Sequence, residues 1–280
     1  MSPSGRAEGI AHLRRAVEAI EARSSAASTP ARARLSLGRA LDRRLSGGLA
    51  LDGLHEIAPA APADGPAATA FALSLAARCL AERRSAGLIV VEDFAERDMG
   101  ALYGPGLAAH GLELARLVFV RAPDAPSLFQ AMEDALRSGA PAFVLGEVWR
   151  LKAYDLTVSR RLLLAARAGA TPALLVQASA YGAADKISSA AETRFEIAAA
   201  PSAHAPSAGA GRGLPGRPSF AARIVKARIA SGHGPPAELD RAKLIRLVWR
   251  SEDRTFDEPA IPLPLAAAVD DRPRAPRTSA

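Results

Sequence analysis

The chain has 280 residues, of which 49% are hydrophobic, so it is long enough for one large α/β core with appendages or for two small domains. Its formal net charge of +7 favours an acidic partner only moderately, because only four of its 36 Lys and Arg residues are lysines and a bias in genome composition produces the same arginine excess. The single cysteine, Cys79, excludes an intramolecular disulfide and a cysteine-based metal cluster, and the lack of a secretory signal and of a run of about 20 apolar residues predicts a cytoplasmic protein that does not bind membranes.

A helix with one apolar face is predicted near the N-terminus. Apolar residues recur there at spacings of three and four, with charged residues between them: Ile10, Leu13, Val17 and Ile20. Small polar residues follow up to Pro30, so residues 1–30 are expected to form a helix and its linker. The apolar face must pack either on the chain's own core or on another protein, and both interpretations remain open.

Short apolar strands then alternate with amphipathic helices. The predicted strands are 54–57, 86–91, 117–120, 142–145 and 173–176, and the predicted helices are 68–84, 98–110 with an interruption at 104–106, 128–136 and 156–168. Such unbroken apolar strands indicate a parallel sheet that is covered by helices on both faces. The predicted fold class is therefore α/β, with a mostly parallel sheet flanked by helices.

The C-terminal part is expected to add an antiparallel hairpin to this core. A strand at 193–197 is followed by a loop rich in Pro, Gly and Ala at 200–218, and a hairpin is predicted at 219–250. The core thus spans 31–257, and the proline-rich residues 258–280 are expected to form a disordered tail.

The loop after the first strand is where α/β proteins hold phosphate. A working phosphate loop needs glycines, a lysine and a Ser or Thr, whereas no lysine precedes Lys152. Prolines remove backbone N–H donors from this loop, and an aspartate brings a negative charge close to any phosphate. The altered loop contains Pro59, Asp64, Gly65, Pro66 and Thr69. We therefore expect no nucleotide cofactor and no hydrolysis.

Other candidate groups for catalysis are sparse. Glu92 and Asp93 follow a strand, where a nucleotide hydrolase places the acid that activates water, although solvated loop carboxylates give the same pattern. Gly146 and Glu147 follow the strand 142–145, where a nucleotide hydrolase places a metal-binding aspartate; the glycine cannot ligate a metal, and Glu147 is a weak candidate for that role. The five histidines show no spacing typical of a metal site, and His55, on an apolar strand, is predicted to be a packed structural residue.

A basic pair stands on the predicted hairpin. Lys226 and Arg228 are two residues apart on one strand, so that both side chains are expected on the same face of the sheet. The pair is either solvated or part of an interface with phosphate or an acidic subunit.

The residues 35–49, with Gly53 and Glu56, resemble the segment that precedes the phosphate loop in RecA-type recombinases, and the resemblance covers roughly residues 35–256. It implies a RecA-like fold. It also implies that Gln177 corresponds to the glutamine that senses nucleotide, and that the basic pair corresponds to residues that reach the nucleotide of a neighbouring subunit.

A narrower resemblance is to the ImuA-type proteins, which are RecA-like. It is carried by the residues 100–124, 131–140, GEVWRL at 146–151, the SRRLLLAARAG run at 159–169 and AAETRFEI at 190–197. This resemblance implies a place in a damage-inducible (SOS) mutagenesis cassette, with a Y-family polymerase-like protein and an error-prone replicative-type polymerase. The absence of the residues that bind phosphate in recombinases then favours a non-catalytic adaptor that binds the polymerase-like protein, RecA or both.

Two alternatives and one addition remain open. The chain could be a DNA-dependent ATPase with an unorthodox phosphate loop, or an inhibitor of cell division that resembles SulA. Direct contact with DNA is a further hypothesis, because the segment 178–192 lies where recombinases hold a DNA-binding loop and carries Tyr181 and Lys186.

Overall fold

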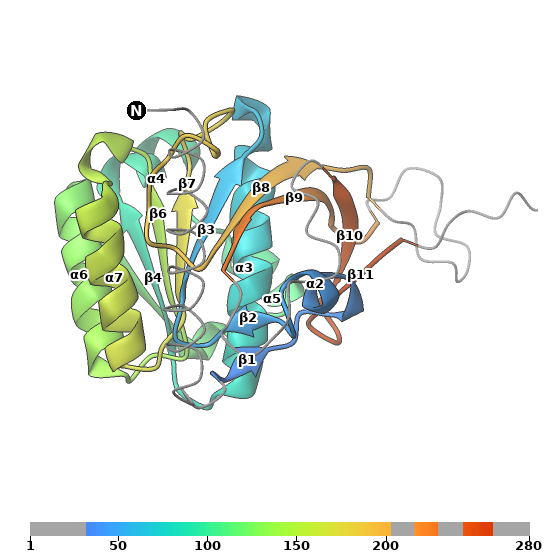
Figure 1. Cartoon of the computed structure of the whole chain (residues 1–280), viewed down its shortest axis with the longest axis horizontal. Coiled ribbons are helices and arrows are strands. Elements are labelled where there is room, and N and C mark those ends of the chain that lie inside the picture. Colours follow the sequence, from blue (N-terminus) through green and yellow to red (C-terminus); the bar gives the residue numbers. More distant parts are fainter. Residues whose placement is uncertain (1–31, 203–215, 229–242, 260–280) are drawn as a thin grey trace, which may run out of the picture.

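The computed structural model describes residues 32–202, 216–228 and 243–259. Within them, nine strands form one sheet in the order β11-β10-β9-β8-β3-β7-β6-β4-β5 (Figure 1). The predicted N-terminal helix with Ile10, Leu13, Val17 and Ile20 lies outside the described residues, as do residues 203–215 of the predicted loop and 260–280 of the predicted tail.

Six neighbouring strands of this sheet, from β8 to β5 in the sheet order, run parallel to one another. They are β3 (Leu54–Pro59), β4 (Gly87–Glu92), β5 (Leu117–Ala122), β6 (Val144–Val148), β7 (Ala173–Gln177) and β8 (Thr193–Ala199). Every residue of β3 is buried, because β7 and β8 flank it and helices cover the sheet. The predicted α/β class with a mostly parallel sheet is confirmed.

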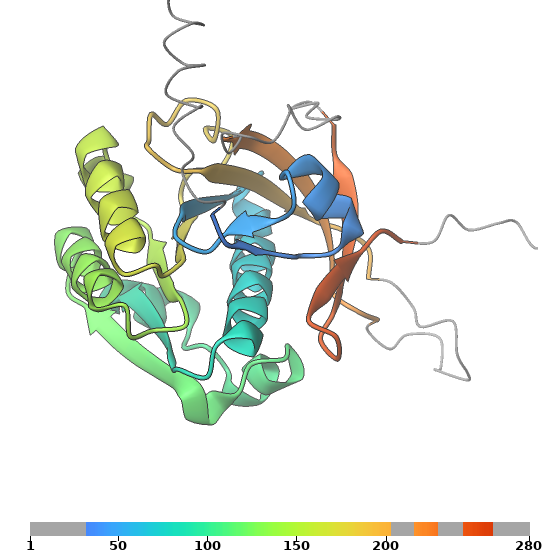
Figure 2. The same ribbon diagram turned by 60° about the horizontal axis from the view of Figure 1, so that its bottom comes forward.

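Helices cover both faces of the parallel strands (Figures 1 and 2). The helices of this part are α3 (Gly65–Glu82), α4 (Asp93–Met99), α5 (Gly104–Ala109), α6 (Ala125–Ser138) and α7 (Leu156–Ala168). The long α3 packs on one face, and α6 and α7 pack side by side on the other. Asp124 and Asp155 cap α6 and α7 by accepting hydrogen bonds from backbone N–H groups of the first turn.

Antiparallel strands extend the sheet beyond β8. They are β9 (Ser219–Ala227), β10 (Ile245–Arg250) and β11 (Thr255–Asp257). The antiparallel pairing of β9 and β10 confirms the predicted hairpin, whereas β11 was not predicted. Phe71 of α3 contacts the rings of Phe195, Phe220 and Phe256 at centroid distances of 5.2, 5.5 and 5.0 Å, which joins the parallel and antiparallel parts in one core.

The segment that precedes β3 supports this core. It contains β1 (Arg34–Leu35), α2 (Arg39–Arg44) and β2 (Leu49–Ala50), none of which was predicted. Gly38 has a φ of 116°, and a Cβ atom there would lie 2.1 Å from the carbonyl oxygen of Phe256, so only glycine fits. Gly38 therefore serves the close packing of this segment on β11.

Two predicted boundaries are wrong. The strand expected at 142–145 is β6, which runs to Val148, so Gly146 and Glu147 lie inside the strand and do not follow it. The Gly-Pro-Gly residues expected to interrupt a helix instead begin α5, because proline is tolerated in the first turn. Among the described residues, no helix has the length and apolar character needed to span a membrane.

Candidate functional site

The loop between β3 and α3 is closed by contacts within the chain. Its last three residues before α3, Pro62–Asp64, form one turn of 3-10 helix. The Asp64 carboxylate accepts hydrogen bonds from the backbone N–H of Ala61 at 3.1 Å and of Ala199 at 2.8 Å. The N–H of Ala60 donates to the carbonyl of Ile197 at 2.8 Å. These contacts direct backbone donors of the loop to groups of the chain itself, including a carboxylate.

One turn further along α3, Thr69 meets a carboxylate of β6. The Thr69 hydroxyl donates to Glu147 Oε2 at 3.2 Å, and the indole N–H of Trp149 donates to Oε1 at 3.1 Å. Burial raises the pKa of Glu147, although both hydrogen bonds oppose this shift. A hydroxyl and a carboxylate thus lie together near the carboxyl ends of the parallel strands.

Glu92 is fully buried, so the interpretation of a solvated loop carboxylate is wrong for this residue. Its Oε1 accepts hydrogen bonds from the backbone N–H groups of Trp149 at 2.7 Å and Arg150 at 3.1 Å. The carboxylate therefore holds the turn that follows β6. Its Oε2 is buried with no hydrogen-bond partner among the described residues.

Gln177 ends β7 and is fully buried. It pairs with Val148 of β6, and both polar atoms of its side-chain amide lack a hydrogen-bond partner within the described part of the chain. Buried amides are normally hydrogen-bonded, so this side chain is a candidate for contact with a group that the chain does not supply.

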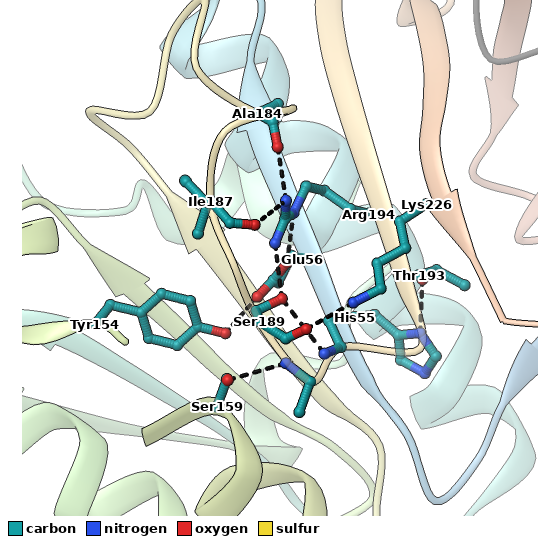
Figure 3. Close-up of polar contacts among 12 residues, drawn as sticks. His55, Glu56, Tyr154, Ser159, Ala184, Ile187, Ser189, Thr193, Arg194 and Lys226 are labelled. Carbon is teal, nitrogen blue, oxygen red and sulfur yellow. Dashed lines mark hydrogen bonds and ion pairs between the residues drawn. The ribbon is translucent and has the colours of Figure 1, made fainter. Parts of the chain in front are cut away.

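A buried ion pair joins Glu56 of β3, the residue after His55, to Arg194 of β8 (Figure 3). Arg194 Nε lies 2.6 Å from Glu56 Oε2, and the two side chains are 3% and 0% exposed. The hydroxyl of Tyr154 also donates to Glu56, and burial raises the pKa of Tyr154 well above its ordinary value. His55 is fully buried, as predicted, and contacts Thr193 and Ala50.

The same arginine holds the segment 178–192. Its guanidinium donates to the carbonyl oxygens of Ala184 at 2.6 Å and Ile187 at 2.7 Å, and to the hydroxyl of Ser189 at 2.7 Å (Figure 3). Arg194 was not predicted as a site residue. The available signal was a charged residue in an alternating strand, together with a glutamate, Glu56, inside an apolar one.

The predicted basic pair is not a matched pair on one strand. β9 ends at Ala227, so Arg228 lies beyond the strand and is exposed. Lys226 is half-buried and donates to the carbonyl of Ser189 at 2.7 Å, and burial lowers the pKa of its ammonium. The lysine therefore supports the segment 178–192, whereas the arginine faces solvent.

Three of the predicted residues come from different elements around β6. Thr69 lies on α3, whereas Glu92 and Gln177 end strands on either side of β6. Across the described ranges, no group of three or more His, Cys, Asp and Glu side chains could hold a metal ion.

Comparison with known proteins supports the resemblance to ImuA-type proteins. The chain is 35% identical over 168 residues to Protein ImuA from each of two strains of Caulobacter vibrioides. The aligned part of the chain is therefore similar in sequence to ImuA. The match covers 57% of this chain and 65% of the ImuA proteins, so just under two thirds of those relatives is matched. The search with protein-family models found no match.

Among solved structures, the chain is similar to SulA from Pseudomonas aeruginosa, with 17% identity and a TM-score of 0.36. The similarity covers 44% of this chain and 96% of the SulA chain. A score this low carries no argument about fold or function.

Proposed function

We propose that the chain is a non-catalytic adaptor in damage-inducible mutagenesis. In this proposal it binds the Y-family polymerase-like protein of a mutagenesis cassette, RecA or both, and reaches an error-prone polymerase indirectly. The similarity to ImuA proteins over the aligned residues supports this role.

The main support for a protein without catalytic activity is the loop after β3, whose backbone donors are bound within the chain. A phosphate in this loop would compete with the Asp64 carboxylate for the N–H groups of Ala61 and Ala199 and would be repelled by its charge. Prolines at 59, 62 and 66 remove further donors. The loop therefore disfavours the anion that a nucleotide hydrolase must hold.

A DNA-dependent ATPase is the second candidate, and the contact between Thr69 and Glu147 favours it. A hydroxyl and a carboxylate near the ends of parallel strands form a donor set suited to Mg²⁺.

Turnover of Mg·ATP with and without single-stranded DNA separates the two candidates. The adaptor proposal predicts that phosphate release by the purified chain equals that of the Glu147→Gln variant at every ATP concentration. Turnover that DNA stimulates and that Glu147→Gln abolishes, with an unchanged circular dichroism spectrum, would establish the ATPase instead.

Docking through the N-terminal residues is part of the proposal, although those residues lie outside the described structure. The apolar residues Ile10, Leu13, Val17 and Ile20 are its candidates. Deletion of residues 1–24 is expected to abolish capture of RecA or of the polymerase-like protein. Capture of both at wild-type levels would remove the helix from the proposal.

Contact with DNA is proposed separately for the segment 178–192. Tyr181 and Lys186 are exposed there, whereas Asp185 pairs with Arg223 at 3.0 Å. An aromatic ring and a cation suit a single strand, and such binding weakens as salt rises. Affinity for an oligonucleotide that does not change between low and high salt would count against this contact.

A further inference from the structure

The outward face of α7 carries arginines around one exposed leucine. Leu164 is 59% exposed, and Arg160, Arg161 and Arg167 stand four residues before, three before and three after it, which places all four on one side of the helix. The other exposed residues of α7 are Thr157 and Ala168. The face thus combines three cations and an apolar centre with no carboxylate among its exposed helical residues.

The two carboxylates that pair with arginines of this face lie mostly below the surface. Glu133 of α6 is bound by Arg137 and Arg161, and its side chain is 10% exposed while theirs are 56% and 57% exposed. Glu192 is 8% exposed and pairs with Arg167 at 2.8 Å. Burial opposes ionisation of both carboxylates, but the bound arginines lower the pKa of each, so both stay charged.

One arginine of this face has no carboxylate partner among the described residues. Arg160 is exposed and has no ion-pair or hydrogen-bond partner among the described residues. Arg137 and Arg161 share the single carboxylate of Glu133, whereas Arg167 shares Glu192 with Arg32, which has Asp52 as a second partner. The face therefore keeps a positive excess that the chain itself does not neutralise.

The helix that presents these residues is fixed on the core. Ser159, which is buried, accepts a hydrogen bond from the N–H of Ala190 at 3.0 Å and donates to the carbonyl of Leu156 at 2.9 Å. The Asp155 carboxylate caps the helix at the N–H of Val158 at 2.8 Å. A rigid platform lowers the entropy lost when a partner binds.

We propose that this face of α7 is a docking surface for an acidic segment of a protein partner, with carboxylates on Arg160, Arg161 and Arg167 and an apolar side chain over Leu164. The inference rests on the proposed adaptor function and assigns the surface to the polymerase-like partner. Arginines around an apolar contact form the kind of centre that dominates binding energy at protein interfaces. Nucleic acid fits less well, because the exposed residues of α7 include no aromatic ring on which a base stacks.

The test measures the affinity of the full chain for the purified polymerase-like protein. Arg160→Glu and Leu164→Ser change exposed side chains without breaking any described contact, and Arg246→Glu makes the same charge change on β10, across the molecule (Figure 1). We expect the dissociation constant to rise about tenfold for each α7 variant and to change less than twofold for Arg246→Glu. Added salt is expected to weaken the wild-type complex more than the Arg160→Glu complex.

Three results would overturn the inference. Unchanged binding by both α7 variants, with wild-type affinity retained, removes this surface while leaving the adaptor function in place. No binding of the polymerase-like protein by the wild-type chain overturns the inference, and it overturns the adaptor function as well when the chain also fails to capture RecA. A parallel titration with an oligonucleotide supplies the remaining alternative: a loss in Arg160→Glu alone, with Leu164→Ser and partner binding unaffected, assigns the face to nucleic acid and contradicts the proposal.

Discussion

Arg194 makes a buried ion pair and several hydrogen bonds in the interior. It neutralises Glu56 inside the sheet and donates three further hydrogen bonds to the segment 178–192. Arg194→Met leaves the buried carboxylate without its cation, so we expect the free energy of unfolding in urea to fall by about 3–5 kcal/mol. The matched change Arg223→Met, at a partly exposed pair with Glu196, should cost about 1 kcal/mol or less. Equal losses would contradict this assignment.

His55 should make stability depend on pH. Its Nε2 lies 2.8 Å from the carbonyl of Ala50 and its Nδ1 lies 2.8 Å from the hydroxyl of Thr193, so the neutral ring satisfies both partners. Burial lowers the pKa of His55 to about 4. The unfolded chain therefore takes up the proton first, near pH 6.5, and stability falls as the pH drops from there toward 4.

This effect can be isolated by comparing wild type with His55→Gln in urea unfolding at pH 7.5 and pH 5. The wild type should lose about 2 kcal/mol more than the variant over this interval, from the titration of one histidine. His110, whose pKa burial also lowers, contributes equally to both proteins and cancels. The same pH dependence in both would show that His55 is not the responsible group.

Helices and strands whose pattern extends over several residues could be predicted from the sequence. The parallel strands form unbroken apolar runs and the long helices show a helical repeat, and α7 begins and ends as predicted. Strands of two or three residues, such as β1 and β11, are too short to show one. The boundary of β6 was missed because Gly146 indicates a strand end, whereas it packs inside the strand, where a Cβ would lie 2.3 Å from Met132 Sδ.

The polar contacts of the site were less predictable. Arg194 and Glu56 are 138 residues apart, and Glu92 finds its donors at Trp149 and Arg150. Such pairs are created by the sheet order, which no local pattern contains. The altered loop after β3 could be predicted, because prolines, an aspartate and a missing lysine are local features.

The edge strand β5 leaves apolar side chains in solvent. Val118 and Phe119 are each 49% exposed, and β4 is the only neighbour of β5 among the described strands. Exposed edges promote strand pairing between molecules, and a charged side chain blocks it. Val118→Lys should lower light scattering at high protein concentration without changing the melting temperature. Thr157→Lys, which adds the same charge on α7, should have no such effect, and equal effects would point to net charge instead.

At the scale of the whole molecule, the fold combines a parallel sheet with a closed loop and an exposed basic face. The carboxyl ends of the strands carry buried groups, among which Glu92 and Gln177 have side-chain atoms without hydrogen-bond partners in the described residues. The outer face of α7 is rigid, charged and accessible. This division favours a protein that acts by binding through its surface.

Calorimetric titration of the full chain with the purified polymerase-like partner, in the absence and presence of Mg·ATP, tests this account most directly. We expect a saturable complex whose dissociation constant agrees within about twofold under both conditions, because the loop after β3 disfavours the nucleotide phosphates. A complex that forms only with Mg·ATP, or no complex under either condition, would contradict it.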